Sequence, residues 1–505
     1  MKRLLVLTVV LSVLLVGMPA VAVADTYTVH PGEDVQAAID GASPGDTIVF
    51  APGTYSLSNT LNVNKSLTLT SEDPYAATKP LLDGGGTLVT IISIAADYVT
   101  VDGLEVANGT GDLVFQSSAY GTMIKNSVVH NSTGDECIQL KGCSQCLIEC
   151  NLAYDCAGDG LNIAEGSSHS VIRNNEVHHS NSPDGVIYVY YSAAMTVEGN
   201  YLHDNTASNG IKVYKMGTWG TNYVRNNLIV NNEFHGKKYN QDGNAIQLYV
   251  PFDEANVDAE LYVQHNTVDS NTGIAGYTIT AGHGIYWGQK YVGGAPVHIL
   301  DNILSNNSGW GIKTELLGSV NPSGEINYND TWNNALGTIS NAFSGVTVGP
   351  NNTSVDPLYS PDYSLRAGSP CIGAGSDGQD MGRLFGECGC APPVIEVTID
   401  IKPGSYPNSI NLGSKGVVPV AVLTTEEFDA SSVDPATVTF AGAAPLRSAL
   451  EDVDGDGDGD LVLHFKTQEL TALNKSSTEA TLIGSTYDGQ DFQGMDTVRI
   501  VPGSK

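Results

Sequence analysis

The sequence is poor in basic residues, with 23 lysines and arginines against 55 aspartates and glutamates, which gives a formal net charge of −32 at pH 7. Nucleic acids and anionic membranes would be repelled by such a chain, so neither is expected as a partner. Beyond residue 24, no apolar run approaches the roughly 18 residues that a membrane-spanning helix needs. We therefore predict no membrane span.

The chain begins with the layout of an exported protein. Lys2 and Arg3 precede an apolar run at residues 4–16, and small residues lead to Ala24. This order is typical of a cleavable secretory signal. We expect residues 1–24 to be a signal peptide and the mature protein to be secreted, either extracellular or held at the cell surface.

Cysteine is scarce, and the eight cysteines fall into two groups, at Cys137, Cys143, Cys146, Cys150 and Cys156, and at Cys371, Cys388 and Cys390. In an exported chain such groups favour disulfides, although zinc also uses the C-x-x-C spacing of residues 143–146. Each group holds an odd number of cysteines. One cysteine of each is left over unless the two groups bond to each other.

Helical periodicity is absent, and a repeat of short strands stands in its place. An asparagine followed by apolar residues recurs every 24 to 39 residues, at Asn126, Asn151, Asn175, Asn200, Asn227, Asn266, Asn302 and Asn329. Each period holds alternating apolar runs separated by glycine, asparagine and aspartate, as strands and turns do. The pattern predicts a parallel solenoid with an internal asparagine ladder.

The repeat resembles the right-handed parallel β-helix of the pectate-lyase-like superfamily. Residues 32–55 resemble its N-terminal cap, and residues 356–382 resemble a closing segment common in exported β-helix proteins. Alternating runs after residue 392 predict a small antiparallel β-sandwich, and residues 399–423 are similar to a C-terminal module of exported prokaryotic proteins. The predicted fold is all-β, with a β-helix over residues 25–391 and a sandwich over residues 392–505.

An aspartate-rich loop, DVDGDGDGDL, lies in the predicted sandwich. Asp452, Asp454, Asp456 and Asp460 occupy positions 1, 3, 5 and 9, and Asp458 offers a backbone carbonyl. Oxygen ligands at this spacing suit Ca²⁺, and the carboxylates would repel one another without a cation. The loop is similar to calcium loops of dockerin-like and integrin-propeller modules, without the glutamate at position 12. We predict Ca²⁺ as a cofactor here.

The stretch AGHGIYWG, with GWGIKTE after it, resembles the histidine and basic motifs of polygalacturonases. The resemblance places hydrolytic acids on coils beside His283, but Asp135 and Glu136 lie five coils earlier, about 24 Å away at about 4.8 Å per coil. Cooperating glycosidase carboxylates are about 5 to 10 Å apart. We predict that His283 is a turn residue, while a loop with acids at residues 253, 254 and 258 leaves an unusual hydrolase site as an alternative.

Side-chain alternation predicts one outward face, formed by Gln139, Asn162, Ile187, Lys212, Gln247, Tyr286 and Lys313, with Tyr214, Tyr249 and Glu315 two positions later. Aromatic rings interleaved with amide and ammonium groups suit stacking on sugar rings. The predicted substrate-binding residues are Tyr214, Gln247, Tyr249, Tyr286 and Lys313. The alternative is an ordinary exposed sheet face.

Catalysis on this face would take the form of β-elimination. A lysine or arginine removes the proton beside a uronate carboxylate while a cation neutralises that carboxylate. The candidate catalytic residues are Lys212, Lys215 and Arg225, with Asp159 or Asp184 as cation ligands.

The sequence thus predicts an exported β-helix protein that binds a polysaccharide or cell-surface glycan. One alternative is a polysaccharide lyase acting on a uronate-containing polymer, or less favourably a glycosidase. The other alternative is a structural or adhesive surface rod. Ionisable residues with perturbed pKa values beside Tyr214 and Tyr249 would favour an enzyme, and a flat face would favour the rod.

Overall fold

The computed structural model describes residues 24–216, 219–235, 243–249, 258–273, 282–289, 296–318, 322–360, 362–384, 395–425, 428–475, 477–487 and 491–501. Residues 1–23 of the predicted signal peptide, the predicted domain boundary near residue 391, Cys388 and Cys390 lie outside these ranges. Within the described ranges, no helix has the length and apolar character needed to cross a membrane.

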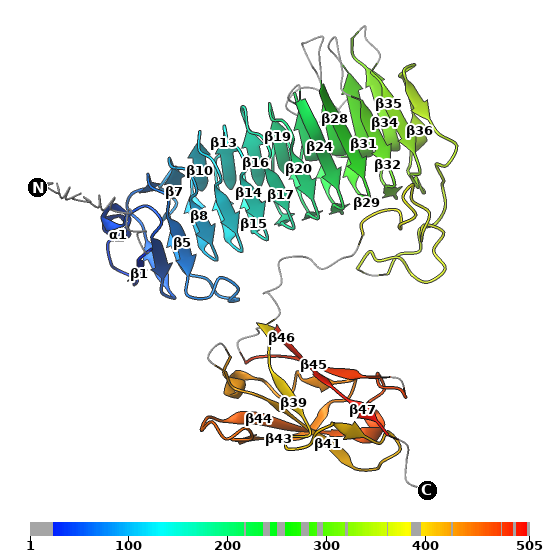
Figure 1. The fold of residues 1–505 in the computed structure, drawn as a ribbon. Helices are drawn as coiled ribbons and strands as arrows, with labels where there is room; N and C mark the ends of the chain where they lie inside the picture. The colour runs from blue at the N-terminus through cyan, green and yellow to red at the C-terminus, as the bar shows by residue number, and fades with distance from the viewer. Residues whose placement is uncertain are drawn as a thin grey trace, which may run out of the picture.

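The N-terminal region is a parallel β-helix, in which most coils contribute a strand to each of three stacked sheets (Figure 1). Sheet A contains β1 (Thr26–Val29), β2 (Thr47–Phe50), β5 (Thr68–Ser71), β8 (Thr100–Asp102), β11 (Met123–Lys125), β14 (Leu147–Glu149), β17 (Val171–Arg173), β20 (Thr196–Glu198), β24 (Trp219–Arg225), β28 (Asp258–Gln264), β32 (Val297–Leu300), β35 (Gly324–Asn327) and β37 (Val346–Val348). Sheet B contains β3 (Thr54–Ser56), β6 (Leu81–Asp83), β9 (Glu105–Gly109), β12 (Val128–Ser132), β15 (Leu152–Cys156), β18 (Glu176–His178), β21 (Tyr201–His203), β25 (Leu228–Val230), β29 (Thr267–Asp269) and β33 (Ile303–Ser305).

Sheet C carries the candidate site. It contains β4 (Leu61–Val63), β7 (Ile92–Ile94), β10 (Val114–Ser117), β13 (Ile138–Lys141), β16 (Leu161–Ala164), β19 (Ile187–Tyr190), β23 (Asn209–Tyr214), β27 (Asn244–Tyr249), β31 (His283–Gln289), β34 (Trp310–Leu316) and β36 (Gly337–Ser340). A small fourth sheet is formed by β22 (Thr206–Ala207), β26 (Glu233–Phe234) and β30 (Thr272–Gly273). The inward residues of successive coils stack into one continuous apolar core.

The first coil is capped by a short helix, as predicted from residues 32–55. Helix α1 spans Val35–Gly41, and the Asp34 side chain caps it by accepting a hydrogen bond from the backbone N–H of Ala37. Val35 and Ile39 are buried against the end of the core. The predicted first strand at residues 47–50 is β2, and β1 pairs with its outer edge.

The predicted asparagine ladder is confirmed, with one correction at its start. From Asn175 to Asn329, each side-chain oxygen accepts both the backbone and the side-chain N–H of the ladder asparagine one coil earlier, at 2.8–3.1 Å. Asn126 stands outside the ladder, because Ser127 donates its backbone N–H to Asn151 instead. A second ladder, which was not predicted, lies five residues further on, at Asn205, Asn232, Asn271, Asn307 and Asn334.

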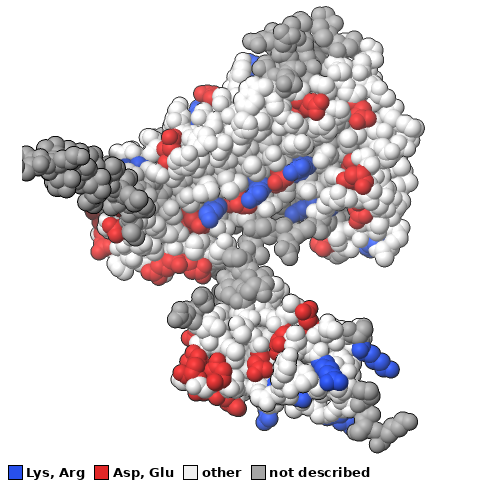
Figure 2. All heavy atoms as spheres, in the orientation of Figure 1, with Lys and Arg blue, Asp and Glu red and all other residues white. Residues whose placement is uncertain are grey.

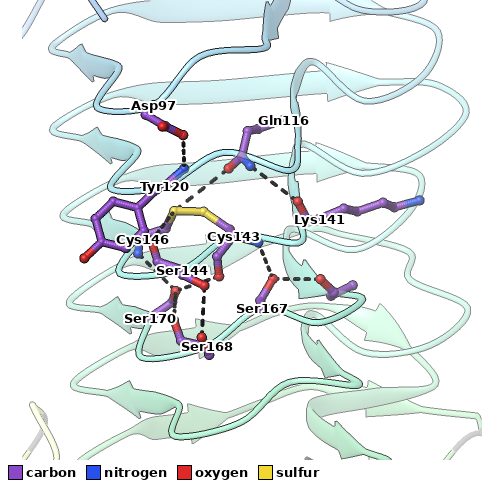
Figure 3. The surroundings of a disulfide bond; sticks show 11 residues. Asp97, Gln116, Tyr120, Lys141, Cys143, Ser144, Cys146, Ser167, Ser168 and Ser170 are labelled. Atoms are coloured by element: carbon purple, nitrogen blue, oxygen red, sulfur yellow. Dashed lines mark hydrogen bonds between the residues drawn. A yellow bond between two sulfur atoms is a disulfide. The ribbon is translucent and has the colours of Figure 1, made fainter.

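The N-terminal cysteine group forms disulfides, as predicted. Cys137 is bonded to Cys156, and Cys143 is bonded to Cys146 in a turn between sheets C and A (Figure 3). Cys150 is also disulfide-bonded. Among the described cysteines, only Cys371 is a free thiol, and it is buried. These bonds exclude a zinc site at residues 143–146.

The C-terminal region has its own apolar core between two four-stranded sheets. One sheet contains β38 (Ile395–Glu396), β46 (Asp491–Thr497), β45 (Glu479–Ser485) and β42 (Thr439–Phe440), and the other contains β39 (Ile399–Ile401), β41 (Val417–Val422), β44 (Asp460–Lys466) and β43 (Pro445–Glu451). β40 (Ser409–Ile410) pairs with β47 (Arg499–Ile500), and two 3₁₀ turns, η2 (Ala430–Ser432) and η3 (Thr467–Glu469), complete the region. The predicted all-β fold, a parallel β-helix followed by a small and largely antiparallel β-structure, is confirmed.

Candidate functional site

The outward column of sheet C follows the prediction except in one coil. Strand register aligns Gln139, Asn162, Tyr188, Lys212, Gln247, Tyr286 and Lys313. Ile187 was predicted in this column, but it pairs with Leu161 and Ile211 and is fully buried in the core. An extra residue before this strand shifts the alternation by one, so the outward residue is Tyr188.

Most of this column is buried, which corrects the prediction of an exposed face. Lys212 is 2% exposed, Gln247 0% and Tyr286 5%, and Tyr249, two positions after Gln247, is also 5% exposed. Lys313 is partly exposed, with its ammonium 3.4 Å from Glu315. The predicted binding residues therefore do not form a flat, solvated surface.

Four tyrosines gather around the predicted Tyr214, and we call the five together the tyrosine cluster. They are Tyr188, Tyr190, Tyr191, Tyr214 and Tyr249, from the ends of β19, β23 and β27, and neighbouring ring centroids are 4.8–5.6 Å apart. These separations are typical of favourable aromatic pairs. Sequence reasoning missed the first three, because the register shift at residue 187 hid them.

Two of the predicted catalytic lysines lie in this cluster, in different surroundings. The buried Lys212 ammonium is 3.1 Å from Asp184 and 5.1 Å from the Tyr188 ring. Lys215 is partly exposed, and its ammonium donates a hydrogen bond to the Tyr191 hydroxyl at 3.2 Å. That hydrogen bond is the main cause of a raised Lys215 pKa. Lys215 is therefore the accessible cation of the cluster.

The third predicted catalytic residue, Arg225, lies elsewhere. It ends β24 of sheet A, and its Nε donates to Glu198 at 2.8 Å. It belongs to a column of alternating charge that runs across the coils, formed by Asp102, Lys125, Glu149, Arg173, Glu198 and Arg225. Figure 2 shows alternating basic and acidic side chains in a diagonal row on the β-helix. The structure does not bring Arg225 together with Lys212.

An acid cluster lies at the beginning of β10 and β13, and we define it as Asp112, Asp135 and Glu136. One oxygen of each carboxylate lies within 4.8 Å of the others. Burial, followed by the neighbouring carboxyls of Asp135 and Asp112, raises the pKa of Glu136 to about 10. Its Oε2 is buried without a hydrogen-bond partner. Sequence reasoning missed Asp112, although it lies 24 residues, or one coil, before Glu136.

The two aspartates predicted as cation ligands are held by the protein itself. Burial raises the pKa of Asp159 to about 7, and its carboxylate accepts hydrogen bonds from the Ser182 hydroxyl at 2.5 Å and the Asn162 amide at 2.9 Å. Asp184 pairs with Lys212. These contacts occupy oxygens that a cation would need.

His283 has a structural role, as predicted, although it is the first residue of β31 and not part of a turn. It is fully buried, and its Nδ1 accepts the backbone N–H of Trp310 at 2.8 Å. The Asn209 side-chain oxygen likewise accepts the backbone N–H of Asn244 at 3.2 Å. Four strands of sheet C lie between β31 and β13, so Glu136 is distant. Residues 253 and 254 of the alternative hydrolase loop lie outside the described ranges.

In the predicted calcium loop, three of the five aspartates converge. One oxygen each from Asp452, Asp454 and Asp456 lies within 4.8 Å of the others, which suits a hard cation. Burial and the neighbouring Asp456 raise the pKa of Asp458. Asp460 instead turns inward, where its two oxygens accept backbone N–H groups of Thr424 and Val453 at 3.0 and 2.9 Å. The loop geometry thus fits a cation without Asp460.

Known proteins share the coil architecture. Residues 112–292 match the family model of the right handed beta helix region. This match spans the acid cluster and the tyrosine cluster, and it agrees with the predicted handedness of the fold. No curated protein sequence matches the chain.

Several solved structures are similar to it at low identity. Pectate lyase Pel9A is 14% identical with a TM-score of 0.40, over 72% of this chain and 97% of that chain. The catalytic unit of a thermostable GH87 alpha-1,3-glucanase from Streptomyces thermodiastaticus strain HF3-3 is 15% identical with a TM-score of 0.42, over 67% and 70%. An alginate lyase from Paenibacillus sp. str. FPU-7 is 14% identical with a TM-score of 0.28, over 64% and 99%. These similarities are too low to transfer a catalytic residue to this chain.

Proposed function

We propose that the protein is exported and binds a polysaccharide or cell-surface glycan at the tyrosine cluster. The observation that supports this proposal is the meeting of five tyrosine rings on adjacent coils with the accessible ammonium of Lys215. Sugar rings stack on such aromatic faces, and an ammonium contacts carboxylate or hydroxyl oxygens. Tyr190, Tyr191 and Tyr214 are at least partly exposed and would meet the ligand first.

The surroundings of the two lysines favour binding over proton abstraction. Lys212 is nearly inaccessible, and its ammonium is paired with Asp184. The raised pKa of Lys215 keeps that side chain protonated at neutral pH. A general base must release its proton near the working pH, so Lys215 is better suited to hold an anionic group than to remove a proton.

Alanine variants of the cluster test this proposal. A panel of neutral glucans and uronate polymers is titrated against the wild type, and the tightest ligand is then titrated against Tyr214→Ala. We expect about a tenfold loss of affinity or more, because stacking area and ring contacts are removed. Tyr262→Ala is the matched control, since Tyr262 stacks between Tyr223 and His298 on sheet A. Equal affinity in both variants would refute the binding site.

A second candidate function, glycan cleavage, rests on the acid cluster. Glu136 retains its proton at neutral pH, as a general acid that protonates a glycosidic oxygen must, and Asp135 beside it is exposed. Lys212 lies three coils further on, about 14 Å at about 4.8 Å per coil. The cluster and Lys212 therefore cannot act on one sugar ring as the two halves of a lyase site.

Product analysis separates the enzymatic outcomes. Hydrolysis releases reducing ends without ultraviolet absorbance, whereas elimination produces an absorbing unsaturated uronide. Glu136→Gln should abolish hydrolysis if Glu136 is the acid, because glutamine cannot donate a proton to the leaving group. Absence of product from every polymer would remove this candidate, and absence of any binding as well would leave a structural or adhesive rod.

Calcium is proposed as a structural cofactor of the C-terminal region. Asp452, Asp454 and Asp456 would bind the ion through their converging carboxylates. The ion would relieve the repulsion among these charges and fix the loop before β44.

A further inference from the structure

A histidine and two aspartates that are far apart in the sequence meet at the side of the β-helix. His265 follows β28, Asp301 follows β32 in the next coil, and Asp377 belongs to the segment after the last coil. The His265 Nε2 is 3.3 Å from the Asp377 Oδ2 and 3.7 Å from the Asp301 Oδ2. The side chains of His265 and Asp301 are 6% and 3% exposed, whereas that of Asp377 is 41% exposed.

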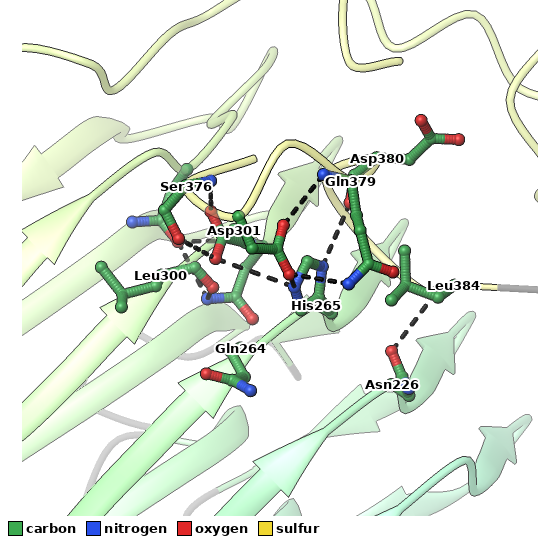
Figure 4. Close-up of polar contacts among 12 residues, drawn as sticks. Asn226, Gln264, His265, Leu300, Asp301, Ser376, Gln379, Asp380 and Leu384 are labelled. Carbon is green, nitrogen blue, oxygen red and sulfur yellow. Dashed lines mark hydrogen bonds and ion pairs between the residues drawn. The ribbon is translucent and has the colours of Figure 1, made fainter. Parts of the chain in front are cut away.

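The segment around Asp377 is held over these two turns by hydrogen bonds. Asp301 accepts the Ser376 backbone N–H at 2.6 Å and the Ser376 hydroxyl at 2.7 Å. Figure 4 shows the stretch with Ser376, Gln379 and Asp380 passing across the strand ends that carry His265 and Asp301. The three candidate ligands are therefore positioned by separate parts of the fold.

The tautomer of His265 is set by the hydrogen bond that its Nδ1 makes. Nδ1 lies 3.1 Å from the carbonyl oxygen of Asp380, and a carbonyl only accepts, so Nδ1 carries a proton. In the neutral imidazole, the lone pair is then on Nε2, which faces the two carboxylates. A histidine ligand whose second nitrogen donates to a backbone carbonyl is the usual arrangement in metal sites.

The distances from the His265 Nε2 to the two carboxylate oxygens fit ligands around a shared ion better than direct hydrogen bonds. Nitrogen–oxygen hydrogen bonds are about 2.7–3.2 Å long, and both contacts of Nε2 exceed this range. Ligands bound at about 2.1 Å in a tetrahedron are about 3.4 Å from one another. One ligand atom from each of the three residues lies within 4.8 Å of the others.

We propose that His265, Asp301 and Asp377 bind one divalent transition-metal ion, with Zn²⁺ as the best match, and that this ion fastens the segment around Asp377 to the β-helix. One imidazole and two carboxylates suit zinc, whereas Ca²⁺ takes six to eight oxygen ligands. The Asp377 side chain is partly exposed, so a water molecule can take the fourth coordination position. The site is independent of glycan binding and of the aspartate-rich loop.

Zinc content measures the proposal directly. The full-length protein is treated with a chelator, desalted, exposed to Zn²⁺, desalted again and analysed for bound metal. We expect wild type to hold one zinc more than Asp377→Asn or His265→Gln. His298→Gln is the matched control, because His298 also lies 3.3 Å from a carboxylate, that of Glu325, but the described residues give it no second acid. This control should bind as much zinc as wild type.

Two further measurements keep the test decisive if a variant folds poorly. Wild type loaded with Co²⁺ should show the intense visible absorption of a tetrahedral site. The melting temperature of wild type, followed by tryptophan emission, should rise by about 2 °C or more with Zn²⁺ but not with Ca²⁺. The Asp377→Asn variant should lose this rise. Equal zinc content in all four proteins, or no tetrahedral Co²⁺ absorption, would mean that His265 only contacts the two carboxylates and holds no metal ion.

Discussion

Replacement of Glu136 by glutamine should make the stability of the β-helix less dependent on pH. Glu136 is 8% exposed, and burial beside Asp135 and Asp112 raises its pKa from 4.5 to about 10. The folded protein therefore keeps the proton that the unfolded chain releases above pH 4.5. The contribution of Glu136 to the free energy of unfolding is fully present below pH 4.5 and is lost as the pH rises toward about 10.

The size of the effect follows from the same shift. Each pH unit within this window lowers the free energy of unfolding by about 1.4 kcal/mol. Wild type should therefore lose about 3 kcal/mol of stability between pH 4.5 and pH 7 through Glu136 alone. Glutamine has a similar shape and is neutral at every pH, as the protonated carboxyl is. The Glu136→Gln variant should equal wild type near pH 4.5 and exceed it at pH 8.

Urea unfolding followed by tryptophan emission measures this prediction. All four tryptophans, at positions 219, 287, 310 and 332, belong to the β-helix, so the signal excludes the C-terminal region. A chelator is present, because a cation bound by the acid cluster would replace the proton. Glu165→Gln, at a side chain that is 58% exposed, is the control and should follow wild type. Parallel pH profiles for wild type and Glu136→Gln would refute the reasoning.

Three other changes have defined outcomes. His283→Asn should leave tryptophan-detected stability within about 1 kcal/mol of wild type, because Asn209 already accepts a backbone N–H at the equivalent position two coils earlier; a loss of glycan cleavage with the fold intact would contradict this. Asn227→Ala should destabilise the β-helix by on the order of 3 kcal/mol, since both ladder neighbours lose partners. Chelation of Ca²⁺ should lower the melting temperature of the C-terminal region, as should Asp456→Asn; equal melting with and without Ca²⁺ would remove the calcium assignment.

The fold was predictable because its signals are local and repeat in every coil. The spacing from Asn151 to Asn329 reports the coil length directly, and each ladder asparagine is fixed by neighbours one coil away. The error at Asn126 and the error at Ile187 have one cause, since a one-residue offset within a turn moves a side chain to the next position. A period of this kind predicts strands well and predicts their register less well.

The candidate sites were less predictable because they depend on burial and on contacts between distant residues. Alternation correctly placed the side chains of Lys212 and Gln247 on the outward side of sheet C. It could not show that both side chains are nevertheless shielded from solvent. Spacing could identify the aspartates from Asp452 onward, although it could not show that Asp460 bonds to the backbone. His265 and Asp377 are 112 residues apart, so no sequence motif joins them.

The most direct test of the account is a crystal structure of the protein with an oligosaccharide from the tightest-binding polymer. We predict a sugar ring stacked on Tyr214 or Tyr190, with a carboxylate or hydroxyl oxygen within hydrogen-bonding distance of the Lys215 ammonium. Sugar density on another face, with the tyrosine cluster left in contact with water, would contradict the proposed function.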